Sequence, residues 1–191
     1  ELVTIMGQSG CGKSTLLNIL GTLDNSDSGQ LKINGNDIEG YNKNQLSQLR
    51  NREIGFVFQS HHLLPDFTAI ENILMPSWIL NEKSAKSDFA IELLKRVGLL
   101  QRKDHFPSQL SGGEKARVAL IRSLINKPRL ILADEPTGNL DQKNALKLID
   151  LLIEINKNYR QSIVLTSHNP DVASIGNQKL VLKNGKLINR D

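Results

Sequence analysis

A short glycine-rich segment, residues 7–15 with the sequence GQSGCGKST, has the composition and spacing of a loop that binds phosphate. The order is glycine, four residues, glycine, lysine and serine, which lets the backbone turn tightly and point several N–H groups at an anion. We expect Lys13 to reach the β- and γ-phosphates of a nucleoside triphosphate, Ser14 to ligate Mg2+ and Thr15 to support a phosphate oxygen. The other residues that this motif brings to the nucleotide are Gly7, Gln8, Ser9, Gly10, Cys11 and Gly12.

The sequence on either side of the loop fits the same interpretation. Leu2, Val3 and Ile5 predict an apolar strand before it. A helix starting near Lys13 adds the positive end of its dipole. The alternative is a chance match on a glycine-rich turn, and Cys11 stands at a position where the motif accepts any residue. The buried side of the helix is expected to consist of Leu16, Leu17, Ile19 and Leu20.

Two adjacent carboxylates, Asp134 and Glu135, follow the apolar run 130–133 and supply a second set of reactive groups. A parallel sheet brings the end of that predicted strand beside the phosphate loop. There Asp134 can hold Mg2+, directly or through water, and Glu135 can accept a proton from an attacking water molecule. The alternative is an ordinary acidic turn after a strand, which the presence of the phosphate loop disfavours.

The segment 110–114, LSGGE, is the most distinctive part of the sequence. Ser111 and Glu114 have the spacing of a capping box at a helix N-terminus, so a purely structural role is the alternative. Two adjacent glycines, Gly112 and Gly113, weaken a first helical turn, however, and make sense where a phosphate must approach the backbone. The segment is similar to the signature sequence of ABC-type ATPases.

The resemblance to ABC-type ATPases implies a particular dimer. In that family the signature faces the γ-phosphate of ATP held by the other subunit, which implies a head-to-tail homodimer with two shared ATP sites. The residues from Ser111 to Glu114 are therefore expected to contact nucleotide. We hypothesise that Ser111 caps its helix in an open state and turns to phosphate in a closed one. Glu114 stands where many members of the family have glutamine.

Other family elements occur in the expected order, so the resemblance covers essentially the whole chain. Gln59 matches the glutamine that senses Mg2+ and water, and the segment 138–141, GNLD, matches a loop that crosses the dimer interface with Asp141. His168 matches the histidine that contacts the γ-phosphate, although an isolated histidine after a strand is more often structural or solvated. The resemblance implies catalytic roles for Lys13, Gln59, Glu135 and His168. No such support exists for His61, His62 and His105, which are expected on the surface.

Residues 56–73 and 133–141 look like the branch of the family that includes the lipoprotein-releasing and macrolide-export ATPases, with a cell-division ATPase among its relatives. That branch implies an integral membrane permease as partner and a peripheral location on the cytoplasmic face of the bacterial inner membrane. A short coupling helix of the permease is expected to dock on apolar residues between Gln59 and Phe67. The alternative is burial of this segment in the helical lobe. The apolar residues concerned are Leu63, Leu64, Pro65 and Phe67.

Alternating strand and helix patterns predict the framework that positions these residues. They indicate an α/β fold of the P-loop NTPase class, with a mainly parallel sheet flanked by helices and ligands at the carboxyl ends of its strands. Peripheral antiparallel hairpins are predicted around Asn-Gly turns at 34–35 and 184–185. We expect a single ABC ATPase domain, 1–191, with a helical lobe of about 68–126 inserted. The predicted strands are 54–58, 130–133 and 162–166, and the predicted helices are 43–51, 69–75, 84–97, 111–126, 142–158 and 170–174.

Two of these helices carry more detailed predictions. Thr68 and Glu71 form a capping box that starts the helix 69–75, and Pro76 is expected to stop it. The helix 142–158 is expected to bury one face. That face consists of Leu146, Ile149, Leu152 and Ile153.

Composition restricts the class of protein. The 24 basic and 20 acidic residues are scattered, and the resulting net charge of +4 gives no basic stripe, so no nucleic acid is expected as partner. A single cysteine allows no internal disulfide, which suits a reducing compartment. The apolar runs are too short to span a membrane, so we expect a soluble chain that reaches the membrane through a partner. Because Glu1 already lies in a predicted strand, we expect further N-terminal strands upstream, with the aromatic residue that stacks on adenine in this family.

Two functions of other classes remain as alternatives. A soluble ABC ATPase that acts on nucleic acid or ribosomes fits poorly, because only a small lobe separates the phosphate loop from segment 110–114. The size of the intact gene product would distinguish this soluble ATPase from an ATPase that works with a membrane permease. A phosphate-loop kinase requires the LSGGE segment to be accidental, and ATP hydrolysis without a phosphoacceptor separates it from an ATPase.

Overall fold

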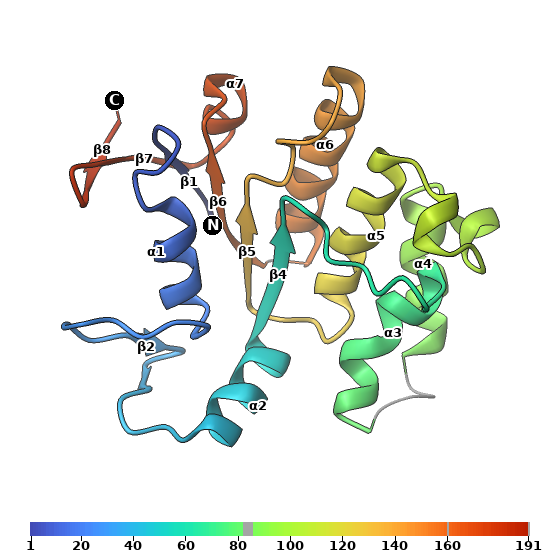
Figure 1. Cartoon of the computed structure of the whole chain (residues 1–191), viewed down its shortest axis with the longest axis horizontal. Helices are drawn as coiled ribbons and strands as arrows, with labels where there is room; N and C mark the ends of the chain where they lie inside the picture. Colours follow the sequence, from blue (N-terminus) through green and yellow to red (C-terminus); the bar gives the residue numbers. More distant parts are fainter. Residues whose placement is uncertain (82–85, 160, 191) are drawn as a thin grey trace.

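The computed structural model describes residues 1–81, 86–159 and 161–190, and six of the described strands form one sheet in the order β4–β5–β6–β1–β7–β8 (Figure 1). Neighbouring strands pair in parallel, except that the edge strand β8 runs antiparallel to β7. This arrangement confirms the predicted α/β fold with a mainly parallel sheet. The strands are β1 (Leu2–Met6), β4 (Ile54–Phe58), β5 (Leu130–Asp134), β6 (Ser162–Ser167), β7 (Gln178–Lys183) and β8 (Lys186–Asn189).

Helices cover both faces of the sheet, because alternate strand residues point to opposite sides. They are α1 (Lys13–Leu20), α2 (Lys43–Glu53), α3 (Ala69–Ile79), α4 (Ser87–Arg96), α5 (Gly112–Leu124), α6 (Gln142–Tyr159) and α7 (Pro170–Ala173). On one face, Leu17 of α1 packs against Ile54 and Leu132. On the other, Ile131 and Ile163 belong to a larger core that includes residues of α3, α4, α5 and α6. Of the residues predicted to line the buried side of α1, Leu17 alone is fully buried.

Both predicted hairpins are present, and both turn at Asn-Gly. The first joins β2 (Lys32–Ile33) to β3 (Asn36–Asp37), and the second joins β7 to β8. The φ angles are 53° and 77° at Asn34 and Gly35, and 51° and 73° at Asn184 and Gly185. These left-handed conformations are what a two-residue type I′ turn requires, which explains why the dipeptide alone located the hairpins.

Helix α3 begins where the capping box predicted, with the Thr68 hydroxyl accepting the N–H of Glu71 and the Glu71 carboxylate accepting the N–H of Thr68. The expected stop at Pro76 is wrong, because the helix continues to Ile79. Proline already has a helical φ and sacrifices one backbone hydrogen bond. Two residues after α5, Nδ2 of Asn126 donates to the carbonyl oxygen of Pro76 at 3.2 Å. This tertiary contact provides a partner for one of the last carbonyls of α3, which have none within the helix.

The other helix boundaries lie close to those predicted. Helix α5 has Ser111 as its N-cap, and α4 is described from Ser87, since the predicted start at 84 lies outside the described residues. Leu146 differs from the prediction, because its side chain is 58% exposed whereas Ile149 and Leu152 are buried. It lies in the first turns of α6, which extend beyond the carboxyl ends of the strands (Figure 1).

Candidate active site

One cavity of about 510 Å3 lies where the carboxyl ends of β1, β4, β5 and β6 open at the same edge of the sheet. The strand order explains its composition, because loops after parallel neighbouring strands converge at that edge. Residues from both halves of the sequence therefore meet in one place, and all of them were predicted as site residues. The cavity is lined by Ser9, Gly10, Gly12, Lys13, Ser14, Thr15, Gln59, Glu135 and His168.

Glycine is required in the phosphate loop for two different reasons, backbone conformation and space. Gly10 and Gly12 have φ angles of 79° and 101°, a region that L side chains rarely adopt. At Gly7 the reason is space, since a Cβ there would lie 2.5 Å from the sulfur of Cys11. Helix α1 then starts at Lys13, and the N–H groups of its first turn have no partners within the helix. The loop and the start of the helix together have the geometry expected of an anion-binding site.

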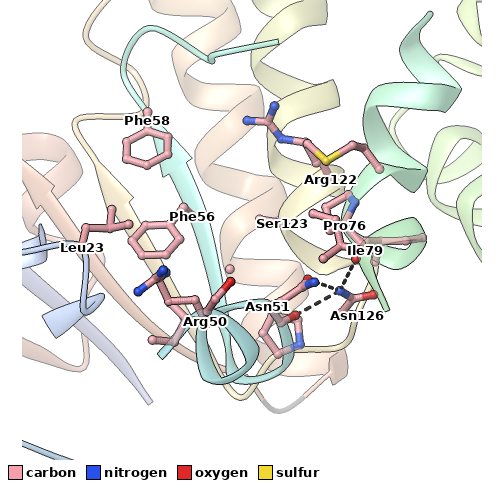
Figure 2. A pocket seen from close by; sticks show the side chains of 16 residues that line it. Leu23, Arg50, Asn51, Phe56, Phe58, Pro76, Ile79, Arg122, Ser123 and Asn126 are labelled. Carbon is pink, nitrogen blue, oxygen red and sulfur yellow. Dashed lines mark hydrogen bonds between the residues drawn. The ribbon is translucent and has the colours of Figure 1, made fainter. Parts of the chain in front are cut away.

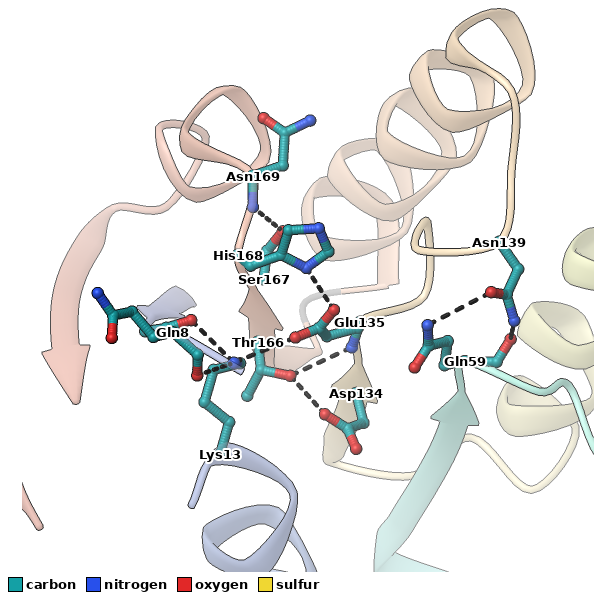
Figure 3. Close-up of polar contacts among 11 residues, drawn as sticks. Gln8, Lys13, Gln59, Asp134, Glu135, Asn139, Thr166, Ser167, His168 and Asn169 are labelled. Carbon is teal, nitrogen blue, oxygen red and sulfur yellow. Dashed lines mark hydrogen bonds and ion pairs between the residues drawn. The ribbon is translucent and has the colours of Figure 1, made fainter. Parts of the chain in front are cut away.

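Lys13 is 5% exposed, and its ammonium group has three partners inside the protein (Figure 3). Nζ donates to the carbonyl oxygens of Gly7 at 2.9 Å and Gln8 at 3.0 Å, and it lies 3.1 Å from Oε1 of Glu135. An ammonium group has three hydrogens to donate, so these contacts use all of them. A phosphate that binds Lys13 must therefore replace at least one of them.

Glu135 lies between this cation and an imidazole (Figure 3). Its Oε2 is 2.5 Å from Nδ1 of His168. Burial raises the pKa of Glu135, but hydrogen bonds and charge from His168 and Lys13 outweigh burial, so the pKa lies below its usual value. Glu135 is thus ionised at neutral pH, which is the form that accepts a proton. Its φ of 41° is left-handed, an uncommon conformation outside glycine that often marks a functional site.

Thr166, which the sequence analysis did not single out, holds the second carboxylate. Its hydroxyl donates to Oδ1 of Asp134 at 2.7 Å (Figure 3), and the two residues are register partners across β5 and β6. The Thr166 side chain is fully buried. Thr166 could have been found only by aligning the ends of β5 and β6, and the sequence alone does not give the register of these two strands.

The oxygen atoms near the cavity suit a hard metal ion. Ser14 offers a hydroxyl, Asp134 a carboxylate and Gln59 an amide oxygen, which are ligands that Mg2+ prefers over softer donors. Within the described ranges, no group of three or more His, Cys, Asp or Glu residues could hold a metal ion. Mg2+ usually keeps water and phosphate oxygens as most of its ligands and is bound through only one or two carboxylates.

Gln59 is tied to the segment 138–141 across the cavity edge (Figure 3). Nδ2 of Asn139 donates to the backbone carbonyl of Gln59 at 3.2 Å, and Nε2 of Gln59 donates to Oδ1 of Asn139 at 3.4 Å. Gly138 leaves room for this pairing, because a Cβ there would lie 2.7 Å from Nε2 of Gln59. Asn139 was part of the GNLD segment but was not predicted as a partner of Gln59.

The LSGGE segment lies at the start of α5 and does not line the cavity of Lys13. Its capping box is formed, with Oε2 of Glu114 accepting the N–H of Ser111 at 2.8 Å and the Ser111 hydroxyl accepting the N–H of Glu114 at 3.3 Å. Gly112 is exposed, and a Cβ there would meet no atom nearer than Leu140 at 4.0 Å. The backbone at Gly112 is thus open to an approaching group.

Close packing against α6 explains why position 113 is a glycine. A Cβ at Gly113 would lie 2.4 Å from Oδ1 of Asn144, on the first turn of α6. Asn144 also donates from its backbone N to Oδ1 of Asp141 at 3.0 Å and from Nδ2 to Oδ2 at 2.6 Å. These hydrogen bonds lower the pKa of Asp141. Asn144 therefore links two segments that were predicted to meet nucleotide, the start of α5 and the end of the GNLD segment.

The segment after Gln59 is more buried than predicted. His62 is exposed, but His61 and His105 are half-buried, and burial lowers the pKa of His61. Arg122 of α5 donates to the backbone carbonyls of His61 at 2.7 Å and His62 at 2.6 Å, which links this loop to α5. Of the four apolar residues expected to be exposed, Leu64 and Pro65 are exposed, whereas Leu63 and Phe67 are half-buried.

A second cavity, of about 340 Å3 and mainly apolar, lies beside this segment. It separates Phe56 and Phe58 of β4 from Ile79 of α3 and Arg122 of α5 (Figure 2). Leu23 and Ile79, on its two sides, are 49% and 63% exposed. An apolar groove with exposed walls is a feature of surfaces that receive a partner.

Comparison with known proteins gives consistent matches along the chain. A family model described as "ABC transporter" matches residues 1–138. The "Lipoprotein-releasing system ATP-binding protein LolD" of Cytophaga hutchinsonii is 49% identical over 190 residues, which cover 98% of this chain and 86% of that protein. LolD 2 of Chlorobium chlorochromatii is 50% identical over 194 residues, covering 98% and 80%. LolD of Treponema pallidum is 46% identical over 187 residues, covering 97% and 83%.

Solved structures agree with these sequence matches. The chain is similar to a dimeric post-hydrolysis structure of the ATP-binding cassette MJ0796 bound to ADP and Pi, with a TM-score of 0.89, 37% identity and coverage of 100% of this chain and 84% of that one. A second dimeric structure, of "MJ0796, a Bacterial ABC Transporter Cassette", gives a TM-score of 0.88 at 39% identity, covering 98% and 83%.

Proposed function

The chain belongs to the ABC transporter family and is an ATP-binding ATPase of that family; on this premise we propose that it drives lipoprotein release by closing head-to-tail with a second copy around ATP. The lipoprotein-releasing names of its relatives favour this substrate class over macrolide export or cell-wall regulation. The proposal treats residues 1–191 as one ABC ATPase domain with a helical lobe of about 68–126.

The observation that carries the proposal is the separation of two phosphate-binding elements within one chain. Lys13 lines the cavity, whereas Ser111 and Gly112 lie at the start of α5, outside it. Figure 1 places α1 and α5 on either side of β5. A helix start that carries an exposed glycine outside the Lys13 cavity suits an anion supplied by another molecule. In the proposed dimer that anion is the γ-phosphate of ATP seated on Lys13 of the second copy.

Hydrolysis follows from the contacts of Glu135. When ATP binds, Lys13 turns from Glu135 to the β- and γ-phosphates, and the carboxylate is released to accept a proton from water. His168 then holds Glu135 or the γ-phosphate through its imidazole. Ser14, Asp134 and Gln59 would hold Mg2+, which when bound would supply charge neutralisation at the phosphate oxygens.

The energy available from one phosphate matches the task of closing a dimer. Hydrogen bonds to charged groups contribute about 1.5–3 kcal/mol each. Moving a two-state equilibrium from 1:99 to 99:1 needs about 5.5 kcal/mol. Two to four such bonds, made to the γ-phosphate by the Ser111 segment of the second copy in the closed state only, would therefore supply about this energy, and their loss on hydrolysis would reopen the dimer.

We propose that the permease docks on the segment from Gln59 to Phe67 and on the apolar groove beside it (Figure 2). The segment is held at one end by Arg122. At the other end Asn72, which is fully buried, accepts the N–H of Leu64 at 2.8 Å and donates to the carbonyl of Phe67 at 2.9 Å. A docking surface fixed at both ends loses little conformational entropy on binding.

Membrane association is proposed to depend on this docking. No helix in the described parts of the chain is both long and apolar enough to cross a membrane. We therefore propose a peripheral position at the cytoplasmic face of the bacterial inner membrane, where the permease brings the chain to its substrate.

The proposed function is tested by reconstituting the chain with its co-purified permease in liposomes that carry an acylated lipoprotein. ATP with Mg2+ is expected to release lipoprotein into solution, and the complex with Glu135→Gln is expected to release none. An intact complex that hydrolyses ATP but leaves lipoprotein in the membrane, with an acceptor protein supplied, contradicts the substrate and not the ATPase activity.

A further inference from the structure

We propose that Thr166 is a positioning residue that sets both carboxylates of the active site through one hydroxyl group. The inference rests on the proposed roles of Asp134 in holding Mg2+ and Glu135 in activating water. It concerns how those two groups are oriented, and it assigns Thr166 no contact with nucleotide.

The hydroxyl of Thr166 makes hydrogen bonds to two successive residues, as donor to the first and as acceptor from the second. Oγ1 donates to Oδ1 of Asp134 at 2.7 Å and accepts the backbone N–H of Glu135 at 3.1 Å. The backbone carbonyl of Thr166 also lies 3.1 Å from that N–H, so it shares the hydrogen with Oγ1. A hydroxyl has one donor hydrogen and two acceptor lone pairs, and this arrangement uses both functions.

The position of Thr166 in the sheet makes the arrangement rigid. On β6, Thr166 pairs with Asp134 of β5 on one side and with Ile5 of β1 on the other, and β1 leads into the phosphate loop. Its side chain is fully buried. Because a β-branched side chain has restricted χ1 rotamers, the hydroxyl is fixed relative to both neighbouring strands.

The backbone of Glu135 needs such support. Its φ of 41° is left-handed, which a residue with a Cβ adopts only where surrounding contacts hold it. The N–H bond to Thr166 fixes one side of the residue, and the N–H of Gly138 donates to the carbonyl of Glu135 at 2.9 Å on the other. The direction of the Glu135 side chain toward Lys13 and His168 follows from that backbone.

An apolar residue could fill the same space. Valine has nearly the shape of threonine, and a buried hydroxyl is unfavourable unless it is hydrogen-bonded. The hydroxyl at position 166 is therefore explained by its two bonds rather than by packing. Partners that orient a metal-binding group typically change metal affinity or activity by about 10-fold to 100-fold when they are removed.

The test compares Thr166→Val, which removes the hydroxyl and keeps the branched shape, with Thr166→Ser, which keeps the hydroxyl. Three quantities are measured on the full chain: ATP hydrolysis, the affinity for Mn2+ in the presence of ATP by electron paramagnetic resonance, and the affinity for ATP in EDTA. For Thr166→Val we expect hydrolysis and Mn2+ affinity to fall by about 10-fold or more, with ATP affinity in EDTA unchanged. Thr166→Ser should recover most of both losses.

Three results overturn the inference. One is normal Mn2+ affinity and hydrolysis in Thr166→Val, another is an equal loss in Thr166→Ser, and the third is a parallel loss of ATP affinity in EDTA. Thermal unfolding of both variants is measured as a control for folding. If Thr166→Val is unfolded, the inference is judged from Thr166→Ser alone, which should retain most of the ATP hydrolysis and Mn2+ affinity. Glu135→Gln serves as reference: if it still hydrolyses ATP, the proposed function fails, whereas an inactive Glu135→Gln beside a fully active Thr166→Val removes this inference only.

Discussion

Nζ of Lys13 lies 3.1 Å from a carboxylate oxygen of Glu135, so the cation proposed to bind phosphate and the base proposed to activate water are paired with each other. Both are largely buried, and a buried charge requires a partner. In the proposed mechanism, ATP binding exchanges the partner of Lys13 from carboxylate to phosphate. The same binding event would then free Glu135 to act as the base.

Replacing Lys13 with methionine tests this exchange. The variant lacks the ammonium group but keeps much of the side-chain volume, and it leaves Glu135 buried without its cation. We expect loss of ATP binding and a higher pKa for Glu135, since the hydrogen bond and charge of Lys13 lower it in the parent protein. Binding of a fluorescent ATP analogue measures the first effect. Nuclear magnetic resonance titration of the carboxyl carbon measures the second, and an unchanged Glu135 pKa would show that the pair contributes nothing.

The lowered pKa of Glu135 also predicts a pH dependence of stability. A carboxyl group whose folded pKa lies below its unfolded value, here 4.5, stabilises the folded protein above that value and loses this contribution as pH falls through the folded pKa. Glu135→Gln has no such group. As pH drops below 4.5, the parent should therefore lose unfolding free energy that Glu135→Gln does not lose, so the variant becomes more stable relative to the parent. Urea unfolding at several pH values between neutrality and the acid limit of folding measures it, and a constant difference refutes the prediction.

The two glycines of the LSGGE segment should respond differently to alanine. In Gly113→Ala the new Cβ meets Asn144 at 2.4 Å, so Asn144 must move away from Asp141. We expect a loss of about 1–3 kcal/mol in stability, as for other overpacked sites. Gly112→Ala points into open space and should not lower stability. It should nevertheless weaken ATP-dependent dimerisation, because its methyl group obstructs the approach of phosphate. Equal stability of the two variants would contradict the packing difference.

Arg122 should be a stabilising residue of the segment after Gln59. Arg122→Met leaves the carbonyls of His61 and His62 without their donor, and the hydrogen bonds lost involve a charged group. We expect a cost of about 3 kcal/mol in the free energy of unfolding, measured with urea. Arg122→Lys, which retains a charged donor, should cost less. If both variants unfold like the parent, the loop does not depend on Arg122.

A surface substitution tests the docking groove. Ile79 is 63% exposed on its wall, and Ile79→Asp should reduce co-purification with the permease while ATP binding by the chain alone stays normal. Leu187→Asp is the matched control, because Leu187 is 46% exposed on β8, away from the groove. Equal capture of the permease by both variants would exclude the groove as the docking site.

Sequence alone predicted the features that depend on local chemistry. The Asn-Gly turns, the capping boxes at Thr68 and Ser111 and the apolar strand at 54–58 each depend on residues close together in the chain, and the structure confirms them. The mainly parallel sheet followed from the alternation of strands with helices, whereas the order of the strands within it was not predicted.

Features that depend on distant residues were missed. Helix α3 continues past Pro76, whose carbonyl accepts a hydrogen bond from the distant Asn126, and Leu146 is exposed although its spacing matches the buried residues of α6. Thr166 and Asn139 reach their partners only through strand register and loop closure. Periodicity cannot report such contacts, since each one joins parts of the chain whose spacing in the sequence is arbitrary.

Closure of two copies on ATP is tested by the mass in solution of Glu135→Gln with saturating ATP and Mg2+. We predict a dimer by size-exclusion chromatography with light scattering and a single chain when ATP is omitted. Adding Ser111→Arg should abolish the dimer, whereas Ser162→Arg, at an exposed serine near the opposite ends of the strands, should leave it intact. If the protein binds ATP and remains a single chain under these conditions, it does not dimerise around ATP.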